Sequence, residues 1–520
     1  MGDVANSTPL LVGAPSSKLQ GKDYDKFVAA HKGRPRAVYV GANDGMLHAF
    51  AADTGAELFA YVPRSVYARL GAYTSPDYVH QPYVDGSAAA GEMQSAEGNW
   101  RTALVSGLGG GARGVFALDV TNPAAFSASN VLWEFTGADD ADMGYVTQAP
   151  RIMKFRTTAA RNGKPAVYRW FAVVPSGFNN GNARKAAALF LLSLDKAPAD
   201  AWERNRNYYK IVLPNPADTA VTNALGPVGD YAASDNTARL LYAGDTQGNL
   251  WKFDLSKSAP WSEATALPLG SAPLMVAKDA NGNRQPITIA PEVGAGPNGG
   301  AIVLFGTGKL VEVDDLGSRR AQTLYGVYDT KSAIPVDQAR TQLQPRTVTA
   351  NDKGQFTISG SAFVYGPYDS DTSQRRGWYF DLPQATDNGE RQVSRMLLSD
   401  GFLLFNTLIP NPNACGAGGG GHTCGVNAMS GLSVGSTCIP STVGLPGSPI
   451  VIQEGEGAFT STDSFGRRTE TRKVAVINLG TGTGNGPGVS ITRPIEGGKV
   501  SQVAGRLNWR QVINFKDLRQ

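Results

Sequence analysis

The residues of this chain that could bind a metal ion are few and lie far apart in the sequence. The run 139–142 reads Asp-Asp-Ala-Asp, and Asp279, Asn281 and Asn283 place side-chain oxygens at alternate positions. Calcium needs about six or more oxygen ligands, with acidic side chains at alternate positions of a loop. Each segment could therefore contribute to a metal site. The expected role of 139–142 is nevertheless a solvated loop, and that of the second segment is an Asn-Gly hairpin turn.

All three cysteines lie between Cys415 and Cys438. Such clustering predicts one disulfide and one odd thiol. Cys415 and Cys424 flank a glycine-rich loop, so they are the expected pair, and their bond would stabilise the fold by roughly 2–3 kcal/mol. The alternative is three free thiols in a cytosolic protein. A zinc site is not expected, because only His422 lies nearby and the CxxC spacing is absent.

No pattern indicates an enzyme active site. The four histidines give no order that would indicate a Ser-His-Asp triad. His48 alternates with Leu47 and Ala49 in a predicted strand, which favours a packed or half-exposed histidine over a metal ligand. The glycine-rich stretch 107–111 is followed by neither a helical pattern nor Gly-Lys-Ser/Thr, so it predicts a turn and not a phosphate cradle. We therefore predict no catalytic, cofactor-binding or metal-binding residue.

Composition narrows the class of protein further. Among 520 residues there are 62 glycines and 31 prolines, which suits a fold with many turns. The net charge is +4, from 48 basic and 44 acidic side chains, and no basic run indicates a nucleic-acid partner. No stretch of about 18 apolar residues is present to span a membrane. No signal peptide is visible at the start, and we expect the native protein to extend further at its N-terminus.

The elements that would position any site are short strands joined by glycine turns. Residues 39–63 read as three strands, with turns at Asn43-Asp44-Gly45 and Asp53-Thr54-Gly55. Residues 241–254 repeat the first part of this pattern most closely. Further units of the same kind follow the same pattern. The corresponding strands of the units start near residues 38, 102, 170, 241, 301, 402 and 473.

A repeat of antiparallel units without sustained helical periodicity predicts an all-β fold, and more specifically a β-propeller. Each unit leaves an apolar face open, and packing unit against unit buries it. We expect one seven-bladed propeller over residues 35–520, preceded by an irregular segment, 1–34, with a short helix around Tyr24–Ala30. In this division Gly377–Leu382 opens the sixth unit. Six or eight blades, or two β-sandwich domains, are the alternatives.

Several motifs occur in the order found in one known family. They are VYVGANDGMLHAF at 38–50, LGGGARGVFALDVTNP at 108–123, LLYAGDTQGNLWKFDL at 240–255, FGTG at 305–308, GWYFDL at 377–382, GER at 389–391 and NTLIP at 406–410. With these motifs the chain resembles the C-terminal propeller domain of the PilC/PilY type IV pilus biogenesis proteins and tip-associated adhesins. One motif alone would be weak support, but several in order are specific.

The resemblance implies a seven-bladed, modified propeller without enzymatic activity. It implies a role in pilus assembly, in which family members counter pilus retraction and can attach to host cells. The implied partners are pilus proteins, including minor pilins at the tip, and a host-cell receptor. The implied location is the bacterial cell surface, at the pilus or outer membrane, reached through the periplasm. Family members also carry an N-terminal domain, so we expect this chain to be the C-terminal part of a longer protein.

Many family members also bind calcium through an Asp-rich loop just before the strand that contains YAGD. By this resemblance the ligand positions here fall on Tyr231, Ala233, Asp235, Thr237 and Arg239. Only Asp235 is a carboxylate, and Arg239 places a cation where an acid is expected. We therefore predict that this loop does not hold calcium tightly. The alternative is a weak site in a shifted register that uses Asp230 and Asn236.

Two other classes of function remain open. Quinoprotein dehydrogenases are the enzymatic rival, because their propellers carry repeats that Asp53-Thr54-Gly55 resembles. Such an enzyme needs a catalytic Asp, a cation that orients the quinone and usually calcium, and no cluster in the sequence indicates that site. The other class is a generic propeller scaffold that binds partners through its loops. The longest loops, 64–99, 196–236 and 411–445, are then the expected contact surfaces.

Overall fold

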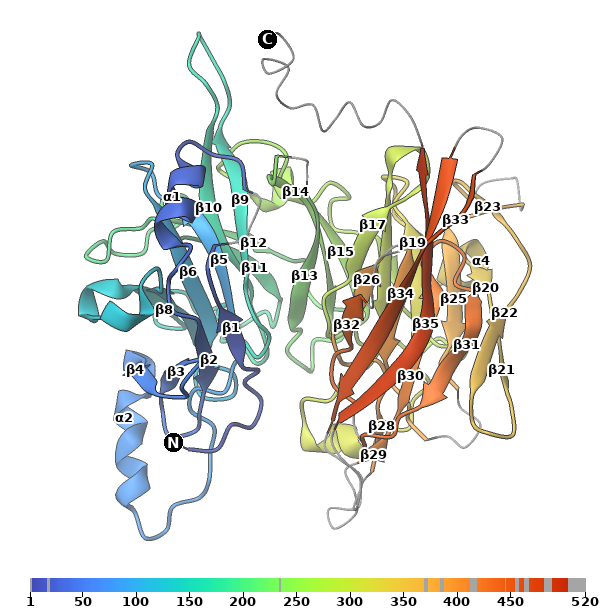
Figure 1. Ribbon diagram of the computed structural model, residues 1–520, viewed down its shortest axis with the longest axis horizontal. Helices are drawn as coiled ribbons and strands as arrows, with labels where there is room; N and C mark the ends of the chain where they lie inside the picture. Colours follow the sequence, from blue (N-terminus) through green and yellow to red (C-terminus); the bar gives the residue numbers. More distant parts are fainter. Residues whose placement is uncertain are drawn as a thin grey trace. The chain divides into compact units, whose positions relative to one another are not determined.

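The protein is built almost entirely from antiparallel β-sheet, with a few short helices (Figure 1). The all-β class predicted from the sequence is therefore confirmed. The chain forms two compact units, the first made of residues 1–278, 284–291 and 331–337 and the second of the remainder. The computed structural model describes residues 2–15, 19–232, 235–368, 373–383, 388–399, 401–411, 419–444, 446–453, 458–462, 467–480 and 489–503.

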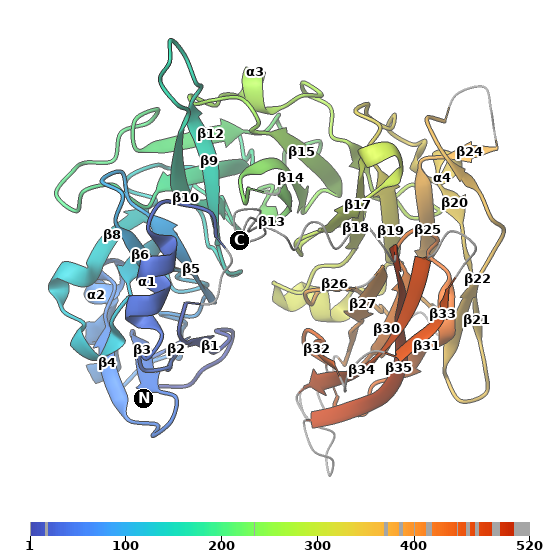
Figure 2. The ribbon, with the colours of Figure 1, turned by 45° about the horizontal axis from the view of Figure 1, so that its top comes forward.

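The first unit contains four sheets, each of four antiparallel strands in chain order. Figure 2 shows these sheets following one another from β1–β4 to β13–β16. Gly45 and Gly248, with φ of 94° and 77°, make the turns that the repeated pattern predicted. The first two sheets consist of β1 (Leu10–Val12), β2 (Ala37–Gly41), β3 (Leu47–Ala51), β4 (Glu57–Tyr61), β5 (Ala88–Gln94), β6 (Trp100–Gly107), β7 (Gly114–Asp119) and β8 (Val131–Thr136). The next two consist of β9 (Arg151–Thr158), β10 (Val167–Pro175), β11 (Ala188–Ser193), β12 (Tyr208–Val212), β13 (Leu225–Ala232), β14 (Ala238–Asp245), β15 (Asn249–Asp254) and β16 (Met275–Val276).

The N-terminal segment is more regular than the sequence suggested. Strand β1 pairs antiparallel with β2, with Leu10 opposite Tyr39, so the first sheet begins before residue 35. Helix α1 (Tyr24–His31) agrees with the short helix predicted around Tyr24–Ala30. It is fixed by burial of Tyr24, whose ring lies 4.6 Å from that of Trp100. The expectation of an irregular segment is therefore only partly right.

Hydrophobic cores lie between successive sheets of the first unit. Side chains of β6 and β7 alternate between two of these cores, because successive residues of a strand point to opposite faces. Leu104 and Phe116 belong to the core shared with the first sheet, and Val105 and Ala117 to the core shared with the third. Burial on both faces explains the continuous apolar runs 103–105 in β6 and 115–118 in β7.

The second unit contains larger and less regular sheets, ordered β17-β18-β19-β25-β20, β21-β22-β31-β30-β27-β26 and β32-β34-β33, the last with β35 paired to β34. Strand β25 joins the fifth sheet, with Trp378 opposite Gly326. The expectation that Gly377–Leu382 opens the sixth unit was therefore wrong, because the intervening β21 and β22 belong to the next sheet.

The strands of the first of these sheets are β17 (Glu292–Ala295), β18 (Ala301–Gly306), β19 (Thr323–Tyr328), β25 (Gly377–Asp381) and β20 (Gln344–Pro345). The second contains β21 (Thr347–Ala350), β22 (Phe356–Ser359), β26 (Leu397–Ser399), β27 (Phe402–Asn406), β30 (His422–Asn427) and β31 (Ser433–Pro440). The third contains β32 (Ile450–Gln453), β33 (Ala458–Thr462), β34 (Arg467–Leu479) and β35 (Val489–Val503). Two-stranded ribbons are formed by β23 (Val364–Tyr365) with β24 (Gln374–Arg375) and by β28 (Ile409–Pro410) with β29 (Gly419–Gly420).

Helices are short throughout the described residues. The α-helices after α1 are α2 (Tyr67–Leu70), α3 (Glu263–Ala266) and α4 (Ala339–Gln342). The 3-10 helices are η1 (Arg64–Val66), η2 (Gly71–Thr74), η3 (Pro123–Ala125), η4 (Ala128–Asn130), η5 (Pro297–Gly299) and η6 (Val313–Gly317). Among the described residues, no helix has the length and apolarity needed to cross a membrane.

Candidate functional site

The loop between β13 and β14 is the segment that the family resemblance marks for calcium. Of the expected ligand positions, Tyr231 lies half-buried in β13, Thr237 is buried and Arg239 is exposed on β14, while Ala233 lies outside the described residues. Asp235 is thus the one carboxylate among the described positions. Strand β9 of the neighbouring sheet runs beside this loop, because Lys154 forms a backbone bridge with Thr237.

Asp235 already has protein partners for its oxygens. The Thr237 N–H donates to Oδ1 at 3.0 Å, and Arg239 Nη2 lies 3.9 Å from Oδ2. The ammonium of Lys154 donates to the backbone carbonyl of Asp235 at 2.7 Å. Partial burial raises the pKa of Asp235, but the Thr237 N–H, Lys154 and Arg239 outweigh that effect and hold it below its ordinary value.

Lys154 occupies an environment shaped for a cation. Its Nζ lies 5.7 Å from the ring centre of Tyr168 and 6.0 Å from that of Trp170, both on the adjacent strand β10. Ring faces attract an ammonium at such distances. Burial lowers the pKa of Lys154, and Asp235 opposes that shift.

The oxygen atoms of this loop do not make a suitable calcium site. Its described residues offer one carboxylate, that of Asp235, and the Lys154 ammonium already occupies the backbone carbonyl oxygen of Asp235. The alternative register, which uses Asp230, does not fit calcium either, because Arg151 Nη2 pairs with Asp230 Oδ1 at 2.5 Å. Asn236 is exposed and adopts a left-handed backbone with φ of 61°.

The second oxygen-rich segment, 279–283, is a hairpin turn, as the sequence predicted. Asp279 Oδ1 accepts hydrogen bonds from the backbone N–H groups of Asn281 and Asn283 at 2.9 and 2.8 Å. Its Oδ2 accepts from the Asn283 side-chain amide at 2.9 Å. The carboxylate therefore holds the turn closed. In the part of the chain that the structure describes, no three His, Cys, Asp or Glu side chains gather closely enough to hold a metal ion.

The acidic run 139–142 is only partly solvated, because Asp139 and Ala141 are exposed whereas the side chains of Asp140 and Asp142 are largely buried. Lys210 on β12 reaches Asp140 Oδ1 at 2.8 Å and Asp142 Oδ2 at 2.9 Å. The Tyr208 hydroxyl donates to Asp140 Oδ2 at 3.1 Å. All three charged side chains are largely buried, with 8% of Asp140, 12% of Asp142 and 11% of Lys210 exposed. The predicted solvated loop is therefore only partly right, since a lysine from a later strand compensates the charges of Asp140 and Asp142.

The disulfide differs from the expected pairing. Cys424 is bonded to Cys438, with their Cα atoms 4.1 Å apart. These residues lie directly opposite each other on the antiparallel strands β30 and β31. Cys438, and not Cys415, is therefore the partner of Cys424, because strand pairing decides which cysteines meet. Cys415 itself lies outside the described residues.

His48 and the glycine-rich stretch have structural roles. His48 is 3% exposed, and its ring nitrogens contact Glu57 Oε1 at 2.6 Å and Asp44 Oδ2 at 3.0 Å, so of the two placements that the sequence left open, packed and half-exposed, the structure shows the packed one. Gly109, with φ of 57°, belongs to the turn between β6 and β7. A Cβ there would lie 2.5 Å from the backbone carbon of Asp85. The stretch is therefore a close-packed turn, as predicted.

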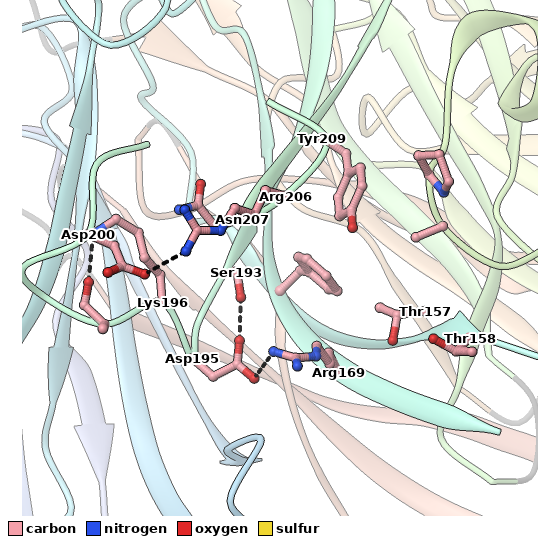
Figure 3. Close-up of a pocket in the computed structure, with 14 residues that line it drawn as sticks. Thr157, Thr158, Arg169, Ser193, Asp195, Lys196, Asp200, Arg206, Asn207 and Tyr209 are labelled. Atoms are coloured by element: carbon pink, nitrogen blue, oxygen red, sulfur yellow. Dashed lines mark hydrogen bonds and ion pairs between the residues drawn. The ribbon is translucent and has the colours of Figure 1, made fainter. Parts of the chain in front are cut away.

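A polar cavity of about 480 Å³ opens beside strands β9–β12 (Figure 3). Arg169 on β10 points to Asp195, with Nη1 2.9 Å from Oδ2. The Ser193 hydroxyl donates to the other oxygen of Asp195 at 2.5 Å. Asp195 is almost fully buried, at 3% exposed, whereas Arg169 is 42% exposed. The carboxylate thus anchors a guanidinium that still faces the cavity.

The opposite side of the cavity carries further polar groups. Arg206 Nη2 lies 3.6 Å from Asp200 Oδ2, and Tyr209 of β12 contributes its hydroxyl, whose pKa burial raises. Among the described residues that line the cavity there is no histidine or cysteine. The exposed guanidinium groups of Arg169 and Arg206 can bind a ligand with acceptor oxygens, such as a carboxylate.

Sequence reasoning missed the two lysines that compensate the acidic loops. Lys154 is 81 residues from Asp235, and Lys210 is 70 residues from Asp140. Neither lies in a pattern that stands out along the chain. The pairings follow from which strands become neighbours, and the sequence alone carries no local signal for them.

Comparison with known proteins gives consistent matches. A family model described as the PilY1 beta-propeller domain matches residues 1–360. A type IV pilus biogenesis factor PilY1 homolog of Xylella fastidiosa is 36% identical over 463 residues, which cover 85% of this chain and 30% of the relative. Type IV pilus biogenesis factor PilY1 of Pseudomonas aeruginosa PAO1 is 31% identical over 555 residues, which cover 98% of this chain and 45% of the relative.

A solved structure agrees with these relatives. The crystal structure of the Pseudomonas aeruginosa PilY1 C-terminal domain matches with a TM-score of 0.63 and 28% identity, and the match covers 89% of this chain and 97% of that one. The chain spans less than half the length of the curated relatives described above.

Proposed function

Because this chain belongs to the family of PilY1 β-propeller domains, we propose that it serves type IV pilus biogenesis as the propeller part of a cell-surface factor. The observation that carries this proposal is the 31% identity to Pseudomonas aeruginosa PilY1 along 98% of this chain. The architecture supports a binding role, since the sheets of the first unit use their apolar faces against one another and leave loops for partners.

The finer role that we propose is to support pilus extension against retraction and to take part in surface attachment. The proposed partners are minor pilins at the pilus tip and a host-cell receptor. One candidate contact surface is the segment 64–83, where Tyr67 is 57% exposed and Val79 is 80% exposed. Arg69 anchors this segment, because its guanidinium donates to the Gly111 carbonyl in the β6–β7 turn and also lies 4.7 Å from the ring centre of Tyr83. Exposed apolar side chains on an anchored segment favour protein contacts.

Gene deletion tests the role directly. Cells without the full-length gene should show fewer surface pili by electron microscopy and smaller twitching zones, and the wild-type gene should restore both. A gene with Tyr67→Ser and Val79→Ser should restore them only in part. Val336→Ser is the matched control, since Val336 is a 50% exposed valine on another loop. Unchanged pilus number, twitching and attachment in the deletion strain would remove the assignment.

We propose that the protein acts by binding and not by turnover. The matching relatives are named as biogenesis factors, which supports this view. The quinoprotein alternative makes a different prediction, namely a bound quinone with its own absorbance band. An absorbance spectrum of the purified chain, together with a dye-reduction assay on alcohols, tests it. A quinone band with substrate-dependent dye reduction would replace the binding role by an enzymatic one.

The prediction of a single seven-bladed propeller is part of this proposal. The match to the PilY1 beta-propeller domain model supports a propeller, and the seven sheets of four or more strands among the described residues support seven blades. A crystal structure of this chain that shows another number of blades, or separate sandwich domains, would contradict it.

A further inference from the structure

We infer that Lys154 takes the place of a metal ion at residues 235–237 of the β13–β14 loop, so that this part of the loop is held by a cation of the chain itself and does not respond to calcium. The inference starts from the contact between Lys154 Nζ and the Asp235 carbonyl oxygen, at 2.7 Å. A backbone carbonyl of a loop is a typical calcium ligand. Here an ammonium from the neighbouring sheet uses it.

The remaining charges around the loop are compensated in the same way. Arg239 lies 3.9 Å from the Asp235 carboxylate, and Arg151 lies 2.5 Å from the Asp230 carboxylate. A divalent ion at this loop would therefore meet cationic side chains within a few ångströms, and like charges at that range repel strongly. A calcium ion would also have to displace the ammonium of Lys154, which is attached to the chain and cannot diffuse away.

Lys154 is held where it is by its own sheet. The backbone of Lys154 pairs in register with Trp170, and the Trp170 and Tyr168 rings lie within about 6 Å of its ammonium. Strand β9 itself touches the loop through the bridge between Lys154 and Thr237. The cation is therefore placed by the strand before any ligand arrives.

A second lysine of this sheet also compensates a loop, although its acceptors are two carboxylates and not a backbone carbonyl. Lys210 bridges Asp140 and Asp142 in the loop that leads from β8 to β9, at 2.8 and 2.9 Å. Lys154 and Lys210 stand on the two outer strands of one sheet, β9 and β12. The sheet β9–β12 thus supplies an internal cation to a neighbouring loop at each of its edges. This repetition argues against a chance contact at Lys154.

Amide hydrogen exchange on the whole 520-residue chain tests the inference. In the wild type, exchange of residues 235–238 should be the same in EGTA and in millimolar calcium, and calorimetry should show no calcium binding. Lys154→Met removes the charge but keeps an unbranched side chain of similar length. It should speed exchange of residues 235–238 by about tenfold, because a charged hydrogen bond is lost.

Two variants serve as controls. Lys164→Met changes an exposed lysine on the same β9–β10 hairpin and should leave residues 235–238 unaffected. Lys210→Met should speed exchange in 139–142 without changing 235–238. Calcium that slows exchange of 235–238 in the wild type would overturn the inference, as would unchanged exchange in Lys154→Met. The calcium titration of the wild type decides the matter even if a variant fails to fold, and it does not depend on the pilus role.

Discussion

Asp245 shows how one buried carboxylate fixes a turn of the repeated sheet unit. It is 0% exposed and accepts hydrogen bonds from the Asn223 amide, the Trp251 indole, the backbone N–H groups of Gln247 and Asn249, and the Asn249 amide. We expect Asp245→Ala to lower the free energy of unfolding by roughly 3 kcal/mol or more, because several buried donors lose their acceptor.

Urea denaturation followed by tryptophan fluorescence measures this loss. The matched control is Asp254→Ala at the other end of the same strand pair, since Asp254 is less buried and accepts from the Ser256 N–H. A loss for Asp245→Ala no larger than that for Asp254→Ala would contradict the role given to Asp245.

His48 and Trp251 occupy the same place in the two most similar units. Each lies three residues after the turn glycine, Gly45 or Gly248, and each contacts an aspartate of that turn through a ring nitrogen. The packed role of His48 was predictable from strand alternation. The aspartates that accept from the two rings were not predictable, because they depend on the direction in which each ring points.

At the scale of the element, the fifth sheet is closed by a tryptophan that fits between glycines. Trp378 on β25 is 0% exposed, and its indole N–H donates to the Ala428 carbonyl at 3.0 Å. A Cβ at Gly326 would lie 2.4 Å from its ring, and a Cβ at Gly431 would also lie 2.4 Å away. We expect Gly326→Ala to cost roughly 1–3 kcal/mol through overpacking.

Chemical denaturation checks this prediction against Gly317→Ala, a position at which an added Cβ meets no atom within 4 Å. Equal stability of the two variants would show that the sheet adapts around Trp378. The motif GWYFDL was recognisable in the sequence, but its sheet was not. A long excursion between β19 and β25 hides the fact that these strands pair.

The Cys424–Cys438 bond belongs to the same scale, because it joins two paired strands. It closes a segment with a sequence separation of 14, and a loop of that size corresponds to about 3 kcal/mol of stabilisation. We expect Cys438→Ser to lose stability of that order and Cys415→Ser to lose little. Peptide mapping of the oxidised protein should find Cys424 linked to Cys438. A linked Cys415–Cys424 peptide would reverse this conclusion.

At the scale of the whole molecule, two compact units and a series of separate cores predict unfolding in more than one step. Scanning calorimetry should give a calorimetric enthalpy larger than the van't Hoff enthalpy. A single transition with equal enthalpies would show that the cores melt together.

The repeated turns and apolar strands made the β-class predictable. The β1 strand and the lysine contacts were not predictable, since they join segments far apart in the chain.

The alternation of β6 and β7 between two cores has a consequence for how such a chain can change. One inserted residue in β6 would exchange the inward partners of Leu104 and Val105, so both neighbouring interfaces would receive side chains of the wrong size at once. A substitution in β6 or β7 damages one interface at a time, whereas the insertion of one residue damages two. Length variation during evolution should therefore collect in the hairpin tips and spare these strands.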